Sequence, residues 1–405
     1  MIKLEKRTRP ESVGLSTARL GRIGEAVQRR IDKGEIAGAV SLVARKGKVA
    51  HLLCQGSSDI EAGVPMRPNT LFRIYSMSKP VTAAALMTLY EEGRFKLDDP
   101  ISSFIPELSR LMVVTGGTLD APTLVPTETP VTFRHLFTHS AGLCYPNPDG
   151  QLVEKLMAKA MLGTHHEEED VPLDEFVRRL ARAPLAHRPG AAWTYGFAID
   201  VLGRLIEVIS GKTFDAFLSE KLFGPLGMKD TDFFVPQEKH GRLGKVYAPR
   251  AGGGFEVVEW STNAFSKKRL FFSGGGGLVA SASDYLQFAS MLLGSGELDG
   301  VRVLGRRTVD LMFSGHIPQL MGRPEILDGS AFGLGHTYGL GGRVLVDESK
   351  GLFGSLGSYG WDGLASTTFW VDRKEELVAM LLPQMIPGPT GMHEQFRTLV
   401  YQALI

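Results

Sequence analysis

Strand-like segments occur only near the two ends of this 405-residue chain. At the start, "AGAVSLVARKGKVAHLLCQG" (37–56) predicts a hairpin, because two β-rich runs flank a Lys-Gly-Lys turn. Strand-like runs return at 342–347, 366–372 and 376–384. The sequence between these end segments predicts mainly helices. A sheet must therefore draw its strands from both ends of the chain.

We expect an α/β (α+β) fold, in which an antiparallel sheet flanked by helices is built from both chain ends and an all-helical insertion domain interrupts it. The predicted boundaries are 1–97 with 262–405 for the sheet domain and 98–261 for the mainly helical domain. The clearest helix is "FAIDVLGRLIEVISG", which keeps apolar residues at helical spacing and stops at Gly211. Pockets tend to form where such domains meet.

Charge and composition exclude several function classes. Lys plus Arg number 45 and Asp plus Glu 44, so no strong field favours nucleic acid or an anionic membrane surface. The two cysteines, Cys54 and Cys144, form no disulfide framework. The start of the chain is charged, and the apolar runs are too short to span a bilayer. We expect a soluble, cytoplasmic protein that binds a small molecule; its oligomeric state stays open.

The segment "RIYSMSKPVTAAALMTLYEEG" combines a serine and a lysine at the start of an apolar run. The run is apolar nearly all round, which predicts a buried helix, and Pro80 places the helix start close to Ser76. Lys79 lies three residues on and shares a face with Ser76. A serine at a helix start, beside a lysine that can accept its proton, is an arrangement for nucleophilic catalysis.

Ser-x-x-Lys alone does not decide the function. The spacing is expected by chance about once in such a chain, and it occurs once. A serine that caps the helix, with a solvated lysine beside it, explains this segment equally well. Ser78 lacks the same relation to Lys79 and is interpreted as structural.

Further motifs follow in a fixed order: "YSMSK", "VTFRHLFTHSAGLCY", "PLAHRPGAAWTYG", "WTYGFAIDVLG", "GGGGLVASASDYLQFASMLLGSGELDG" and "GSYGWDGLASTTFWVD". Over most of its length the chain resembles the class C β-lactamase-like superfamily of penicillin-recognising serine hydrolases. Within that superfamily it is most similar to the family VIII carboxylesterases. The resemblance implies a β-lactamase/transpeptidase-like fold and a serine esterase without a metal or other cofactor.

The resemblance also implies roles for single residues. Ser76 is the expected nucleophile and Lys79 its partner. Tyr195 is expected to act with Lys79 as general base and then to protonate the leaving group, although a core tyrosine at a helix start is the alternative. The Ser76 and Leu364 N–H groups are the expected oxyanion hole, with Gly363 allowing close approach of the strand. Tyr145 is expected in the acyl pocket.

The chain departs from the pattern of penicillin-directed relatives at two motifs. The second motif normally reads Tyr-x-Asn, and here Phe197 replaces the asparagine. The third normally opens with a cation, and here Trp361 stands there, followed by Asp362 and Gly363. A tryptophan cannot pair with a substrate carboxylate but offers a flat apolar wall. We therefore expect neutral, short-to-medium acyl esters, with Trp361, Asp362, Gly363 and Phe197 in the substrate pocket.

Other motifs give weaker indications of function. His135 and His139 have metal-ligand spacing but lack the glutamate of His-Glu-x-x-His, and His165 and His166 precede a solvated acidic run. The glycine run 274–277 lacks the βαβ context of a dinucleotide site, so we expect a loop near the active site. Gly-x-Ser-x-Gly does not occur. The remaining alternatives are a β-lactamase or D-alanyl peptidase, a transesterase, and a non-catalytic binding protein.

Overall fold

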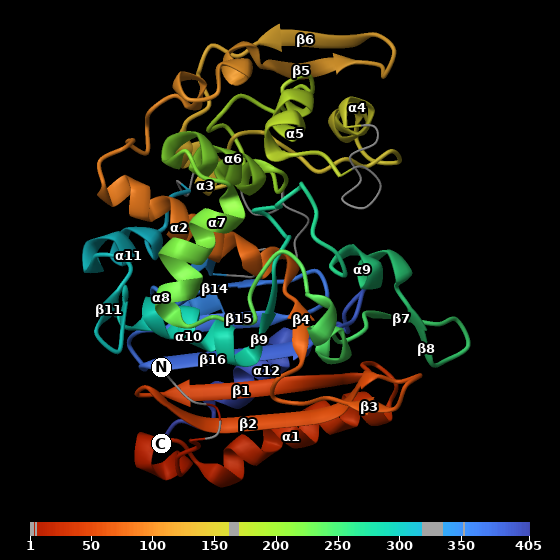
Figure 1. The fold of residues 1–405 in the computed structure, drawn as a ribbon, viewed down its shortest axis with the longest axis vertical. Helices are drawn as coiled ribbons and strands as arrows, with labels where there is room; N and C mark the ends of the chain where they lie inside the picture. The colour runs from red at the N-terminus through yellow and green to blue at the C-terminus, as the bar shows by residue number, and fades with distance from the viewer. Residues whose placement is uncertain (1–3, 5, 162–169, 318–334, 351–352) are drawn as a thin grey trace.

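The computed structural model describes residues 4, 6–161, 170–317, 335–350 and 353–405. It has a broad sheet with helices on both faces, and a largely helical region lies beyond one of these faces (Figure 1). The helix α2 (Ser78–Glu91) runs between the two regions. The expected mixed α/β class with a large antiparallel sheet is confirmed.

Strands from both ends of the chain meet at the centre of the sheet. Strand β1 pairs with β16 in antiparallel register from Ala39 opposite Pro383 to Arg45 opposite Leu377. The neighbours of these two strands are also antiparallel. In sheet order the strands are β12 (His336–Tyr338), β13 (Arg343–Leu345), β14 (Tyr359–Asp362), β15 (Thr368–Asp372), β16 (Leu377–Pro383), β1 (Gly38–Arg45), β2 (Lys48–Asp59) and β3 (Val64–Pro65).

Both faces of the central strands are covered, which explains their continuous apolar sequence. On one face, β1 and β16 pack against α1 (Thr17–Asp32) and α12 (Met392–Tyr401). On the other face, β15 and β16 pack against α10 (Ala282–Leu293). Ser16 caps α1 by accepting a hydrogen bond from the Arg19 N–H. A bridge between Leu15 and Leu404 brings the two end segments together.

The helical region is organised around α6 (Ala198–Ser210), the helix predicted most clearly. It ends at Gly211, whose φ of 71° is left-handed and suits glycine. Helix α6 packs against α2, which joins the helical region to the sheet. The other helices here are α3 (Phe133–Phe137), α4 (Leu152–Ala160), α5 (Leu173–Leu180), α7 (Phe214–Leu218), the π-helical η5 (Ser219–Phe223) and α8 (Gly224–Leu226).

The prediction that the insertion is all-helical is wrong. It contains an antiparallel hairpin of β5 (Met112–Gly117) and β6 (Pro122–Pro126), at the far end of the helical region in Figure 1, and a second pair, β7 (Tyr247–Pro249) with β8 (Phe255–Val257). Gly117 makes the first turn possible, since its φ is 89° and a Cβ there would lie 2.3 Å from the Ala121 carbonyl oxygen. The domain boundaries stay a prediction.

Several short elements connect the two regions. The strands β4 (Leu71–Arg73) and β9 (Val279–Ser281) pair beside the start of α2. The remaining elements are α9 (Glu259–Ala264), β10 (Glu297–Leu298), β11 (Val301–Arg302), α11 (Arg306–Met312) and the 3₁₀ turns η1 (Pro10–Val13), η2 (Tyr75–Met77), η3 (Ile101–Ser103), η4 (Pro106–Arg110), η6 (Gln237–Arg242) and η8 (Glu348–Lys350). Within the described ranges, no helix is long and apolar enough to cross a membrane.

Candidate active site

Ser76 lies in the 3₁₀ turn η2, directly before α2. The predicted helix is present, and its residues from Ser78 to Leu89 are buried on all sides. Ser76 itself is only half-buried. Its predecessor, Tyr75, has a φ of 42°, a left-handed conformation that is strained for a residue with a side chain. The sharp turn therefore presents Ser76 at the exposed end of a buried helix.

Lys79 is fully buried, and its Nζ has three hydrogen-bond partners. These are the Ser76 Oγ at 3.0 Å, the Tyr145 hydroxyl at 3.2 Å and the Gly275 carbonyl oxygen at 2.7 Å. An ammonium group has three N–H donors, so this set satisfies all of them. The Tyr195 ring adds a cation–π contact, with Nζ 4.5 Å from its centroid.

Tyr195 lies beside Lys79, at the start of α2. Its hydroxyl accepts a hydrogen bond from the Trp361 Nε1, at 3.1 Å. Its ring is stacked on Trp193, at a centroid distance of 5.6 Å, and contacts His139 at 4.7 Å. These rings hold Tyr195 in one orientation, and the indole N–H can stabilise charge on its oxygen.

Tyr145 approaches Lys79 more closely than the sequence indicated. Its ring meets Tyr195 edge to face at 5.5 Å. Burial, together with the neighbouring Tyr195 and Asp200, raises the pKa of Tyr145 well above its ordinary value. Tyr145 is therefore a neutral hydroxyl that holds Lys79, and two tyrosines share the site.

Gly363 follows β14 and lies against the segment that carries Ser76. A Cβ at Gly363 would be 2.5 Å from the Ile74 carbonyl oxygen and 2.2 Å from the Thr367 Oγ1. Only a glycine lets the end of β14 come this close. Leu364 comes next in the chain, and its side chain is 53% exposed. The role of the Leu364 N–H in an oxyanion hole stays a prediction.

Three predicted pocket residues lie differently from expectation. Phe197 is 1% exposed and packs behind Tyr145, at a ring distance of 4.9 Å. Trp361 is 4% exposed, because Tyr338 and Tyr195 cover its ring. Asp362 makes an ion pair. These side chains pack against the residues of the site and do not form an exposed wall of the substrate pocket.

The ion pair of Asp362 involves the next strand of the sheet. The Arg343 guanidinium lies 2.6 Å from one carboxylate oxygen and 2.8 Å from the other. Although burial opposes it, Arg343 keeps the pKa of Asp362 below its ordinary value. The Arg343 guanidinium also lies 5.8 Å from the Trp361 ring. The cation on this side of Trp361 is thus already neutralised by Asp362.

The glycine run 274–277 forms the loop that brings the Gly275 carbonyl to Lys79. Thr82 of α2 donates a hydrogen bond to the Gly274 carbonyl at 2.8 Å, and the Ser78 hydroxyl accepts one from the Leu278 N–H at 3.1 Å. The loop near the active site was predicted, whereas its contact with Lys79 was not. The glycine run itself was the available signal, since glycines permit close backbone approach.

The two histidines at metal-ligand spacing have separate environments within the fold. His135 accepts a hydrogen bond from the Thr132 N–H, within the N-terminal cap of α3. His139 is buried among aromatic rings, and burial together with Lys79 holds its pKa well below the usual value. No group of three or more potential metal ligands occurs in the part of the chain that the structure describes. His165 and His166 lie outside the described residues.

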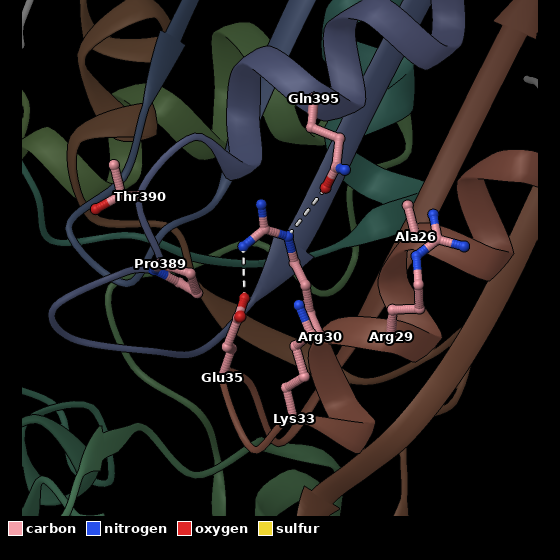
Figure 2. A pocket seen from close by; sticks show the side chains of 8 residues that line it. All are labelled: Ala26, Arg29, Arg30, Lys33, Glu35, Pro389, Thr390 and Gln395. Carbon is pink, nitrogen blue, oxygen red and sulfur yellow. Dashed lines mark hydrogen bonds and ion pairs between the residues drawn. The ribbon is translucent and has the colours of Figure 1, made fainter.

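A separate surface pocket of about 460 Å³ lies on the other face of the sheet, between the end of α1 and the start of α12. Figure 2 shows the Arg30 guanidinium between Glu35, at 2.7 Å, and Gln395, at 3.1 Å. Arg30 is therefore already bound within the protein. The residues around this pocket are Ala26, Arg29, Arg30, Lys33, Glu35, Pro389, Thr390 and Gln395, and none of them is a predicted site residue.

The mixed fold, with a buried lysine between a serine and two tyrosines, is that of the β-lactamase-like serine hydrolases. Residues 23–397 match the family model described as beta-lactamase. The chain belongs to this family. An uncharacterised protein of Mycobacterium tuberculosis (strain CDC 1551 / Oshkosh) is 34% identical over 370 residues, which cover 89% of each chain.

Esterases are among the similar proteins. Esterase EstB of Burkholderia gladioli is 29% identical over 393 residues and 92% of each chain. The solved structure of EstCE1, described as a hydrolase with promiscuous acyltransferase activity, has a TM-score of 0.80 and 26% identity and covers 95% of this chain and 99% of its own. The predicted resemblance to family VIII carboxylesterases of the β-lactamase-like superfamily is confirmed.

Proposed function

We propose that this serine ester hydrolase cleaves neutral, short-to-medium acyl esters through an acyl-enzyme formed on Ser76. The observation that carries the proposal is the hydrogen bond of 3.0 Å between the Lys79 Nζ and the Ser76 Oγ in a buried site. The similarity to EstB and EstCE1 supports the reaction class.

The proposed acylation has one bond formed and one broken at the ester carbonyl. The Ser76 Oγ bonds to the carbonyl carbon as its proton passes to the Tyr195 oxygen, whose negative charge the Lys79 ammonium group stabilises. The negative oxygen is stabilised by the N–H groups of Ser76 and Leu364. The intermediate then loses its alcohol, which takes up the proton from Tyr195. Water repeats the sequence, releases the acid and restores Ser76.

The preference for neutral esters rests on charge. Asp362 neutralises the Arg343 guanidinium, and Trp361 replaces the cation that penicillin-directed relatives place at the third motif. Phe197, in place of the asparagine of the second motif, is buried and offers no amide. An anionic β-lactam would therefore find no free charge partner at these two motifs. β-Lactamase or D-alanyl peptidase activity is the weaker alternative.

Acyl transfer to an alcohol is a second candidate function, which the similarity to EstCE1 favours. It uses the same acyl-enzyme, and only the acceptor differs, since an alcohol takes the place of water. A partition experiment with an added alcohol distinguishes transfer from hydrolysis, because transfer yields a new ester in place of the free acid.

The proposal is tested with p-nitrophenyl esters of graded acyl length and a chromogenic cephalosporin. We expect Ser76→Ala to lose at least a thousandfold in kcat/KM, and mass spectrometry to find the acyl group on the Ser76 peptide of the wild type. Ser78→Ala is the matched control, because Ser78 is the adjacent serine with a structural contact, and it should still form the adduct.

Two results contradict the proposal. Equal ester turnover by the wild type and Ser76→Ala would exclude Ser76 as the nucleophile. Cephalosporin turnover faster than ester turnover would overturn the interpretation of Trp361 and Phe197 as adaptations to neutral substrates.

A further inference from the structure

A buried carboxylate lies behind the lysine of the site. Asp200, in the first turn of α6, is 1% exposed. Its Oδ1 accepts hydrogen bonds from the Ser273 Oγ at 2.5 Å and from the Gly275 N–H at 3.1 Å. Its Oδ2 is buried and has no hydrogen-bond partner among the residues that the structure describes. The catalytic steps described above leave this group unused.

Gly275 bridges Asp200 and Lys79 in space. Gly275 donates its N–H to Asp200 and accepts from Lys79 through its carbonyl oxygen, at 2.7 Å. The fit is tight, because a Cβ on Gly275 would lie 2.6 Å from the Asp200 Oδ2. A Cβ on Gly274 would lie 2.7 Å from the Ile199 carbonyl oxygen. Glycines are therefore required for the loop to lie between the two charged groups.

The groups that contact Lys79 in the described part of the chain carry no negative charge. The three hydrogen-bond partners of Lys79 are uncharged groups. The titratable side chains that face it are Tyr145, Tyr195 and His139, and the lowered pKa of His139 keeps that ring neutral. A buried ammonium group needs an opposite charge nearby. The N-terminus of α6 in turn favours a negative charge on Asp200.

We propose that Asp200 is the counter-charge of Lys79, a positioning residue that keeps the ammonium form stable and fixes the Gly275 carbonyl against it. Asp200 contacts no substrate and acts through the loop. The inference rests on the proposed function, because it requires Lys79 to take part in ester cleavage. It gives a role to an aspartate that is buried next to the Gly275 loop of a site proposed to act on neutral esters.

Asp200→Asn tests the charge separately from the hydrogen bonds. The amide oxygen can still accept from Ser273 and Gly275, while the negative charge is lost. Without the counter-charge the positively charged site is less stable, so we expect the alkaline limb of kcat/KM against pH to move down by roughly half a unit to one unit. Ser273→Ala keeps the charge of Asp200 and removes one of its hydrogen bonds. The alkaline limb of the pH profile of this variant should therefore stay at the wild-type position.

Asp284→Asn is the matched control. Asp284 is also a buried aspartate in the first turn of a helix, α10, and it accepts hydrogen bonds from the Asp230 N–H at 2.6 Å and the Thr231 Oγ1 at 3.0 Å. Its substitution removes a buried charge without touching Lys79. The pH profile of this variant should coincide with that of the wild type.

The outcomes separate the inference from the proposed function. An unmoved alkaline limb in Asp200→Asn, at any level of activity, overturns the counter-charge and leaves a structural role. Should Asp200→Asn not fold, the pair Asp200→Glu and Asp200→Gln makes the same comparison of a charged with a neutral side chain. Activity that does not depend on Ser76 refutes the proposed function instead.

Discussion

The Gly275 carbonyl oxygen lies 2.7 Å from the Lys79 Nζ, although the two residues are 196 positions apart in the chain. The Ser-x-x-Lys motif is thus completed by a loop that begins after the helical region. Lys79 is held on three sides, by Ser76, Tyr145 and Gly275. Its geometry is therefore fixed before any substrate arrives, which is the condition for electrostatic catalysis.

The two tyrosines can be distinguished by exchange for phenylalanine. We expect Tyr195→Phe to lower kcat by about 10²- to 10⁴-fold, the usual contribution of a general acid–base group. Tyr145→Phe should lower kcat about tenfold, because Lys79 keeps its contacts with Ser76 and Gly275. Steady-state rates with one p-nitrophenyl ester measure both. A larger loss of kcat in Tyr145→Phe than in Tyr195→Phe would assign the role of general base to Tyr145 instead.

Gly363→Ala should damage the proposed oxyanion hole. The new Cβ would meet the Ile74 carbonyl oxygen and the Thr367 Oγ1 and push the Leu364 N–H away from Ser76. We expect kcat to fall about 10²-fold, as when one oxyanion donor is lost, with a smaller change in KM. Circular dichroism checks that the fold persists. An unchanged kcat would remove Leu364 from the oxyanion hole.

Gly21→Ala is the control for adding a methyl group. Gly21 lies on the exposed side of α1, and a Cβ there meets no atom within 4 Å. Because alanine favours the helix, we expect the free energy of unfolding to rise by about 0.5–1 kcal/mol, with kcat unchanged. Urea denaturation of both glycine variants shows whether the effect of Gly363→Ala is specific to the site.

His51 should make the fold sensitive to acid. Burial, and then the nearby Arg7, lowers the pKa of His51 from 6.5 to about 4. The unfolded chain therefore binds the proton first, and stability present above pH 6.5 is lost as the pH falls towards 4. We expect the free energy of unfolding from pH 7 to pH 5 to drop by about 1 kcal/mol more in the wild type than in His51→Gln.

Glutamine at position 51 can still bond to Ser41, whose Oγ lies 2.9 Å from the His51 Nε2. The comparison therefore isolates the titration. Urea unfolding curves at the two pH values measure it, and parallel losses in both proteins would contradict the assigned shift.

The sheet and the main helices were predictable because their signals are local. Apolar runs predicted β1, β16 and α6, and Pro80 placed the start of α2 near Ser76. The hairpin of β5 and β6 was missed, since its strands are short and half-exposed and lack a strong apolar pattern.

The candidate site was less accessible to sequence reasoning. Ser76, Lys79 and Tyr195 follow motifs, and the structure brings them together. The Gly275 carbonyl is a backbone group, so no residue type in the sequence predicts its contact with Lys79. Asp200 was interpreted only as part of a helix, because its contact with the glycine loop depends on tertiary packing. The burial of Phe197 and Trp361 likewise depends on neighbours from distant segments.

The pairing of β1 with β16 has a consequence for synthesis of the chain. Strand β1 is synthesised long before its partner β16, because the middle of the chain lies between them. Until then β1 has an unpaired, apolar edge that other nascent chains could join. Strand β14, which directly precedes the proposed oxyanion residue Leu364, belongs to the same late part of the sheet. Esterase activity should therefore begin only after β16 has been synthesised and paired with β1.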